Sequence, residues 1–366
     1  MNKDLPKTMH AVVLTGHGGF DKMEYRNDVP VPLPKNNEVL IRVAAAGVNN
    51  TDINTRIGWY SKSVTSDTNM GSEKGLNEAS NNDASWSGTP LQFPRIQGAD
   101  VCGYIVSVGS DVDSSRIGER IIARTMQSNP NKKNNYSCWT MGSEFDGAFA
   151  QYTVIRSSET FKVNCNWSDI ELASLPCAYS TAEGLLHRTN TGAEEVFITG
   201  ASGGVGSAAI QLAKIRGARV TAQCSSTKHE QVKKIGADVI VDRNTDLLTK
   251  LGKNFFDVVI DLVAGPNWSQ LLELLKSGGR YATSGAIAGP IVDLDVRTLY
   301  LKDLTLYGCT YQPVEIFENL IKYIEQNKIR PLVAQTFPLE QIKTAQQVFL
   351  SKKFIGKIVL RIPSQN

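Results

Sequence analysis

The residues best suited to chemistry lie in a glycine-rich run at 200–206, directly after the apolar stretch 196–198. This order predicts a strand, a tight turn and the start of a helix. Small residues let the backbone approach a pyrophosphate, whose charge is then held by free N–H groups at the helix N-terminus. The alternative is a structural turn that binds nothing. The run predicts a nucleotide site made by Gly200, Ala201, Ser202, Gly203, Gly204, Val205 and Gly206, with Ala201 standing where the G-x-G-x-x-G fingerprint has its first glycine.

Polar residues about twenty positions further on indicate which dinucleotide fits. An NAD site usually has Asp or Glu there, to accept from the ribose 2′-hydroxyl. Segment 223–228 reads Gln-Cys-Ser-Ser-Thr-Lys and contains no acid. Ser225, Ser226 and Lys228 can donate to a 2′-phosphate and neutralise part of its charge. We therefore expect NADPH, although Ser225 could also cap a helix and Lys228 could be an ordinary surface lysine.

A parallel sheet is needed to hold these residues. Strand patterns recur between helical segments at 219–224, 239–241, 257–261, 280–284 and 304–307. The helix that begins after the glycine run has one apolar face, made by Val205, Ala208, Ala209, Leu212 and Ala213. Strands alternating with helices predict an α/β fold with a Rossmann-type, doubly wound parallel sheet.

The chain before this region has a different pattern. Residues 8–157 look rich in short strands separated by Gly, Pro, Asn and Asp turns. A closing strand at 355–360 is expected to return to that first domain. Segment 61–88 is polar and almost free of aliphatic residues, so it predicts either a mobile loop or a lid or specificity loop over the site.

Size and composition limit the classes of protein. A chain of 366 residues favours two domains. The net charge of +3 gives no reason to expect nucleic acid or a membrane as the main partner, and no run of eighteen apolar residues exists. The six cysteines form no C-x-x-C pair, which fits buried reduced thiols. We expect a cytoplasmic protein.

Five segments together resemble the medium-chain dehydrogenase/reductase superfamily and, within it, the zinc-free quinone oxidoreductase (zeta-crystallin-like) branch. They are residues 46–52, 98–103, 147–152, the glycine run and 356–360. The resemblance implies a β-rich GroES-like catalytic domain at 1–157 and 313–366. It also implies a Rossmann dinucleotide-binding domain at 158–312, with the substrate cleft between the two.

The resemblance also addresses zinc. In the zinc alcohol dehydrogenases a Cys stands where Asn49 stands, and Gly-His-Glu begins the segment that reads Gly-Ala-Asp at 98–100 here. Cys177 matches the third ligand, but one thiolate does not make a zinc site, and a small buried hydrophobe is the alternative. Only Cys138 lies in the region of the four-cysteine structural zinc lobe. No metal is therefore expected.

Matching positions and the chemistry name further residues. Thr181, Val263, Ser284 and Gly285 are expected to contact the cofactor, since the last three follow strand ends. Hydride transfer leaves negative charge on the substrate oxygen, which needs a donor. The candidates are Asn49, Thr51, Asp52 and Tyr60. Alternatively, Asn50 or Thr51 caps a short helix with Asp52 in its first turn, and Tyr60 is a packing aromatic.

The resulting hypothesis is an enzyme, an NADPH-dependent quinone oxidoreductase that works without zinc on a small-molecule substrate. The nearest alternative is an NADPH-dependent reductase of α,β-unsaturated aldehydes, ketones or enoyl thioesters. A third is a non-catalytic nucleotide-binding structural protein. The resemblance also implies a homodimer, with residues 304–308 at or near the contact.

Overall fold

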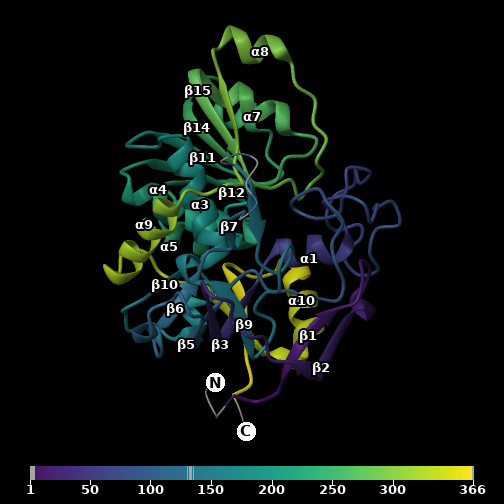
Figure 1. Ribbon diagram of the computed structural model, residues 1–366. Helices are drawn as coiled ribbons and strands as arrows, with labels where there is room; N and C mark the ends of the chain where they lie inside the picture. Colours follow the sequence, from purple (N-terminus) through teal and green to yellow (C-terminus); the bar gives the residue numbers. More distant parts are fainter. Residues whose placement is uncertain (1–4, 130, 132–133, 135, 365–366) are drawn as a thin grey trace.

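Six parallel strands form the sheet expected in the middle of the chain. Their spatial order is β13-β12-β11-β14-β15-β16, and every neighbouring pair is parallel. The order reverses between β11 and β14, which is the switch point where doubly wound sheets bind ligands. The predicted fold is thus confirmed (Figure 1). The strands are β11 (Glu195–Ile198), β12 (Arg219–Cys224), β13 (Val239–Asp242), β14 (Phe256–Asp261), β15 (Leu275–Thr283) and β16 (Thr305–Gly308).

Helices cover both faces of this sheet. Side chains alternate along β11, so Val196 and Ile198 join the core under α3 and α4, whereas Phe197 joins the core under α7. The helices are α3 (Pro176–Arg188), α4 (Gly204–Ile215), α5 (His229–Ile235), α6 (Leu247–Leu251), α7 (Trp268–Leu274), α8 (Val296–Leu301) and α9 (Val314–Glu325), with the 3-10 turn η4 (Ser226–Lys228).

The first part of the chain is rich in strands, as expected. Strands β10-β6-β5-β3-β18-β17 form one sheet to which β9 adds by pairing with β3, and β2-β1-β4 and β7-β8 form two smaller sheets. The strands are β1 (Thr8–Leu14), β2 (Met23–Pro30), β3 (Glu38–Val48), β4 (Arg95–Ile96), β5 (Cys102–Val108), β6 (Arg120–Ala123), β7 (Met126–Ser128), β8 (Cys138–Thr140), β9 (Tyr152–Arg156), β10 (Thr160–Lys162), β17 (Val333–Pro338) and β18 (Lys357–Arg361). Short helices complete this part: η1 (Phe20–Lys22), α1 (Asn50–Ile57), η2 (Ser114–Arg116), η3 (Ser157–Glu159), α2 (Asp169–Leu172), η5 (Leu339–Gln341) and α10 (Ile342–Ser351).

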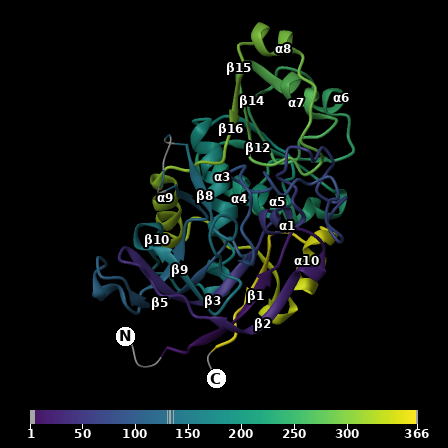
Figure 2. The same ribbon diagram turned by 45° about the vertical axis from the view of Figure 1, so that its right-hand side comes forward.

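The closing strand returns to the first part of the chain, as the sequence predicts. In the sheet β18 lies antiparallel to β3, with Ile358 opposite Val48. Figure 2 shows the yellow C-terminal segment among the purple and blue N-terminal strands. The exact domain limits stay a prediction, and α9 lies beside one of them: its buried Phe317, Leu320 and Ile324 belong to the core shared with α3 and β11.

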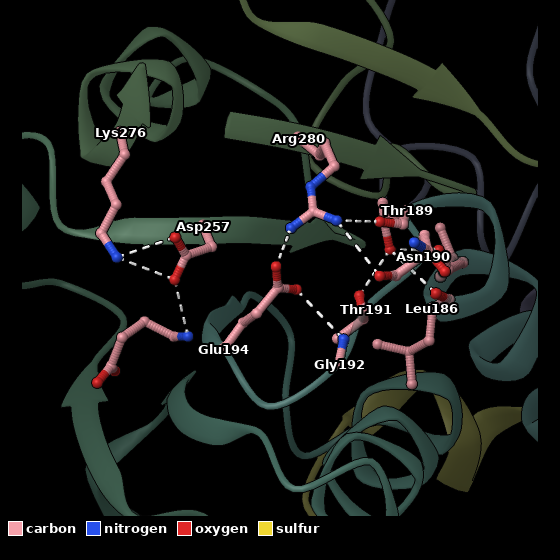
Figure 3. A network of polar contacts seen from close by, with 11 residues as sticks. Leu186, Thr189, Asn190, Thr191, Gly192, Glu194, Asp257, Lys276 and Arg280 are labelled. Atoms are coloured by element: carbon pink, nitrogen blue, oxygen red, sulfur yellow. Dashed lines mark hydrogen bonds and ion pairs between the residues drawn. The ribbon is translucent and has the colours of Figure 1, made fainter. Parts of the chain in front are cut away.

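Ion pairs hold the start of the parallel sheet. Arg280 on β15 donates to Glu194 at 2.5 Å and to the backbone oxygen of Thr189 at the end of α3 (Figure 3). Lys276 pairs with Asp257 on β14 at 2.9 Å. This network lies at the end of the sheet where β11 begins, so it fixes the connection between α3 and β11. The glycine run lies at the opposite end of β11, where the strand ends.

The computed structural model describes residues 5–129, 131, 134 and 136–364. The ends of the predicted first domain, 1–4 and 365–366, lie outside this part. No helix among the described residues is long and apolar enough to cross a membrane. All six cysteines are free thiols, but only Cys102 and Cys224 are buried.

Candidate functional site

The glycine turn joins β11 to α4 in the predicted way. Gly200 has φ +58°, in the left-handed region. A Cβ on Gly206 would lie 2.4 Å from the backbone oxygen of Gly200, so only glycine lets α4 pack this closely on the turn. The N–H groups of the first helical residues have no partner inside the helix, because no carbonyl precedes them at the required spacing. The turn therefore offers donors that suit a pyrophosphate.

Two lysines meet beside this turn. Lys228 Nζ lies 3.3 Å from Ser202 Oγ and 2.6 Å from the backbone oxygen of Lys352. Lys352 donates to Asn50 Oδ1 at 3.0 Å. Burial lowers the pKa of Lys228, whereas burial and then the charge of Lys228 lower the pKa of Lys352 to about 8. Among the described residues no carboxylate forms an ion pair with either lysine. The pair thus carries uncompensated positive charge, and Lys352 has no counterpart among the sequence-based predictions.

The two predicted serines lie at the same end of β12. Ser225 precedes η4 as its N-cap without a side-chain capping bond, and its hydroxyl lies 3.2 Å from that of Thr227. The backbone N–H of Ser226 donates to Asp242 at 2.8 Å. An acid is therefore near in space although segment 223–228 contains none. Asp242 also accepts from the N–H of Asn244, so both its oxygens have partners.

The loops after β14 and β15 lie against the glycine turn. A Cβ on Gly200 would approach Val263 Cγ2 to 3.2 Å, and one on Gly285 would approach the Leu262 backbone oxygen to 3.5 Å. The structure thus brings Gly200, Val263 and Gly285 together, with Ser284 next to Gly285. Thr181 lies one turn after Cys177 on α3.

A buried polar cluster lies where α1, β18 and the segment before β5 meet. Lys357 Nζ is 2.9 Å from Asp100 Oδ2 and also donates to Asn49 Oδ1. The Asn49 amide donates to the same Asp100 oxygen at 2.8 Å, while the N–H of Cys177 donates to the other at 2.6 Å. Lys357 and Asp100 are 3% and 0% exposed. A Cβ on Gly204 would contact the Lys357 side chain at 2.9 Å, so this cluster adjoins the start of α4.

Asp52 anchors the start of α1. Its carboxylate accepts from the N–H of Asn49 at 2.8 Å and from that of Gly98 at 3.2 Å. Burial raises its pKa to about 7, helped by the charge of Asp100 and opposed by these two bonds and by Lys357. Asn49 is the N-cap, so the cap lies one residue earlier than Asn50, and Asp52 is in the first turn as expected.

Thr51 and Tyr60 contact each other beside this cluster. The Tyr60 hydroxyl donates to Thr51 Oγ1 at 3.3 Å, and burial raises the Tyr60 pKa. The same oxygen accepts from the indole N–H of Trp86 at 2.6 Å. The four predicted catalytic residues therefore gather at one end of α1. Lys357 and Trp86 were not predicted. Two sequence patterns could have indicated them: Lys357 lies in an apolar strand, and Trp86 is an aromatic residue in a polar segment.

Asn49 and Cys177, two of the positions matched to zinc ligands, both contact Asp100, which follows Ala99, the position matched to the histidine. Asn49 and Asp100 bond each other, and the Cys177 backbone bonds Asp100. Burial raises the pKa of the half-buried Cys177 thiol, so it stays protonated at neutral pH. In the described part of the chain no three His, Cys, Asp or Glu side chains are grouped so as to hold a metal ion.

Comparisons with known proteins agree with this architecture. The family model "Alcohol dehydrogenase GroES-like domain" matches residues 35–165, and "Zinc-binding dehydrogenase" matches 204–326. The quinone oxidoreductase of Lama guanicoe is 27% identical over 97% of this chain and 98% of its own. The acryloyl-coenzyme A reductase of Metallosphaera sedula is 28% identical over 96% and 99%.

A solved structure is more similar. A protein of Sinorhizobium meliloti 1021, provisionally named an alcohol dehydrogenase, is 42% identical, has a TM-score of 0.87, and matches over 99% of this chain and 98% of its own. Similarity over nearly the full length of both chains covers the β-rich part and the parallel sheet together. The chain therefore belongs to the medium-chain dehydrogenase/reductase superfamily of oxidoreductases.

Proposed function

We propose that the chain reduces quinones with NADPH, by hydride transfer and without zinc. The observation that carries the proposal is the position of the Lys357 ammonium group, which donates to Asp100 and Asn49. An ammonium group there neutralises the carboxylate that lies between Asn49 and Cys177, two of the positions matched to zinc ligands. Both Asp100 oxygens already accept hydrogen bonds, so a metal would have to displace Lys357 or the Cys177 N–H.

The choice of NADPH rests on Lys228 and Lys352. A 2′-phosphate beside them would compensate two ammonium groups whose charges otherwise repel each other. Ser202 and Ser225 add hydroxyl donors at the same end of the sheet. Asp242 lies beside Ser226, and its two carboxylate oxygens accept from the backbone N–H groups of Ser226 and Asn244.

The residues of the cluster divide into two roles. When bound, NADPH supplies a hydride, and the resulting negative charge is carried by the oxygen atom of the substrate. The Asn49 side-chain amide donates to Asp100 and accepts from Lys357, so we assign Asn49 a positioning role together with Asp52. The Thr51 hydroxyl can donate to the substrate oxygen, whereas the Tyr60 hydroxyl donates its hydrogen to Thr51.

Reduction of enoyl thioesters is the second candidate. The acryloyl-coenzyme A reductase is as similar to this chain as the quinone oxidoreductase is. Both reactions need the same cofactor, the same hydride step and a donor to the carbonyl oxygen.

The test is NADPH oxidation by chelator-treated enzyme offered quinones, 2-alkenals, an enoyl thioester and simple alcohols, with NADH as control. Quinone turnover with NADPH would support the proposal. Turnover of enones alone would replace it with the second candidate. Alcohol oxidation restored by zinc would overturn it, and tight NADPH binding without turnover would favour a non-catalytic protein.

We also propose that the protein is a homodimer joined at the β16 edge of the parallel sheet. Strand β16 ends the parallel sheet: it pairs with β15, and no other strand of the described residues pairs with its second side. Large apolar side chains are exposed just before this strand, in α8 and the segment that leads into it: Ile291, Val296, Tyr300 and Leu301, each 58% exposed or more. A second copy pairing along β16 would cover these side chains and the open strand edge.

A further inference from the structure

Segment 61–88 reaches back to the start of α1 through the side chain of Trp86. The indole N–H of Trp86 donates to Thr51 Oγ1 at 2.6 Å, which is short for such a bond. Its ring packs on Tyr60 with centroids 4.7 Å apart. Trp86 and Tyr60 are both half-buried, whereas Thr51 is 8% exposed. The segment therefore contributes one aromatic residue directly to the candidate site.

The hydroxyl of Thr51 has a defined hydrogen-bonding state. A hydroxyl group has two acceptor positions and one hydrogen, and an indole N–H can only donate. Trp86 and Tyr60 both donate to Thr51 Oγ1. Within the described part of the chain no acceptor takes the hydrogen of Thr51 itself. Both acceptor positions of the Thr51 hydroxyl are therefore occupied, and the hydroxyl is free to donate its own hydrogen.

Other bonds hold the segment in place. Arg56 donates to the backbone oxygen of Ser72 at 2.6 Å, and Trp59 donates to that of Ser66 at 3.0 Å. On the far side, the N–H of Thr68 donates to Ile287 at 3.2 Å, in the loop that follows Gly285. The segment therefore spans from α1 to the loop expected to border the cofactor, as Figure 1 shows to the right of α1.

We propose that Trp86 is a positioning residue of the active site: its N–H holds the Thr51 hydroxyl so that Thr51 donates to the carbonyl oxygen of a flat conjugated substrate. This inference rests on the proposed function. Reduction increases the negative charge on that oxygen, so a donor fixed in advance stabilises the transition state more than the ground state. Segment 61–88 is then a specificity element, because it supplies both the N–H and the aromatic surface beside Tyr60.

The experiment compares the indole N–H groups of Trp86 and Trp59, which each form a hydrogen bond between segment 61–88 and the α1 region. Trp86→Phe removes the bond to Thr51 and keeps an aromatic ring. Trp59→Phe is the matched control, because it removes an indole bond that also ties down the segment but does not touch Thr51. We expect Trp86→Phe to lower kcat for quinone reduction about tenfold with KM within about twofold of wild type. The control is expected to stay within about twofold in both.

Thr51→Val provides the second arm. It is expected to lower kcat at least as much as Trp86→Phe, and the double variant Thr51→Val/Trp86→Phe should be no slower than Thr51→Val alone. Thr51→Ser should restore most of the rate. If Trp86→Phe does not fold, Tyr60→Phe removes the other donor onto Thr51 and must show the same dependence on Thr51.

The outcomes are distinguishable. Equal losses in Trp86→Phe and Trp59→Phe, or independent effects that multiply in the double variant, would overturn the role of Trp86 while the proposed function stands. If the wild-type enzyme reduces neither quinones nor enones with NADPH, the proposed function fails, and the role of Trp86 is overturned with it.

Discussion

At the scale of single residues, the site contains two sets of charged side chains that differ in burial and in charge compensation. Lys357 and Asp100 compensate each other in the core, whereas Lys228 and Lys352 repel each other at the edge of the glycine turn. A compensated buried pair holds structure together, and an uncompensated pair is suited to an anion. The two lysine sites therefore differ: Lys357 is buried and paired with a carboxylate, whereas Lys228 and Lys352 are half-buried and form no ion pair with a described carboxylate.

The uncompensated pair gives a prediction on cofactor binding. Lys352→Gln is expected to weaken NADPH binding about tenfold or more and to leave NADH binding unchanged, because only NADPH carries the phosphate. Lys353→Gln, at the exposed neighbouring position, is the control. NADPH affinity of the wild type should also fall as the pH rises above about 8, where Lys352 loses its proton. Fluorescence titration measures both, and equal losses for NADH and NADPH would contradict the assignment.

Asp52 gives a prediction on stability. Its pKa is raised to about 7 in the folded state from 3.8. Between these values the folded state holds a proton that the unfolded state has lost, so the free energy of unfolding falls as the pH rises from about 4 to about 7. The contribution is about 4 kcal/mol at most, at about 1.4 kcal/mol for each unit.

Asp52→Asn removes this titration. Denaturant unfolding at pH 4.5 and pH 7 should therefore show a smaller fall in stability for the variant than for the wild type. An identical fall in both proteins would show that other groups dominate.

At the scale of elements, the approach of α4 to β11 decides whether the turn can bind a pyrophosphate. Gly206→Ala would place a methyl group 2.4 Å from the Gly200 oxygen, so α4 must move outward. We expect a loss of about 1–3 kcal/mol in the free energy of unfolding, together with weaker binding of both cofactors. Gly203→Ala is the control. Its Cβ would lie 3.4 Å from the same oxygen, and the φ of Gly203, −75°, is one that alanine also adopts. Equal effects of the two substitutions would refute this account.

Local sequence patterns predict several elements of the fold but not the contacts between distant segments. The six parallel strands and α4 follow from periodicity and glycine spacing, because neighbouring residues determine them. Asn49, Thr51, Asp52 and Tyr60 were named only through the family resemblance. Trp86, Lys352 and Lys357 were missed because each meets its partner through a contact between segments distant in sequence, 308 residues apart for Lys357 and Asn49. No local pattern contains such a contact.

At the scale of the whole molecule, strand β16 has no second partner strand among the described residues, and α8, just before it in the chain, exposes large apolar side chains. If two copies pair there, the native mass is about 80 kDa, twice the 40.0 kDa of the chain. Leu301→Glu, in the exposed face of α8, is expected to shift the protein toward the monomer because it would bury a charge in the contact. Leu33→Glu, at an equally exposed leucine of the β-rich part, is the control. Light scattering after gel filtration measures the mass, and a monomeric wild type would refute the dimer.

The pairing of β18 with β3 has a consequence for the order of folding. Asn49 and Lys357 belong to these two strands or their ends, and the entire parallel sheet lies between them in the chain. Closing so long a loop carries a large entropic cost, and distant contacts of this kind form slowly. During refolding, the parallel sheet should regain its compactness before turnover returns, because the cluster that holds Lys357 is completed only by the last strand to dock.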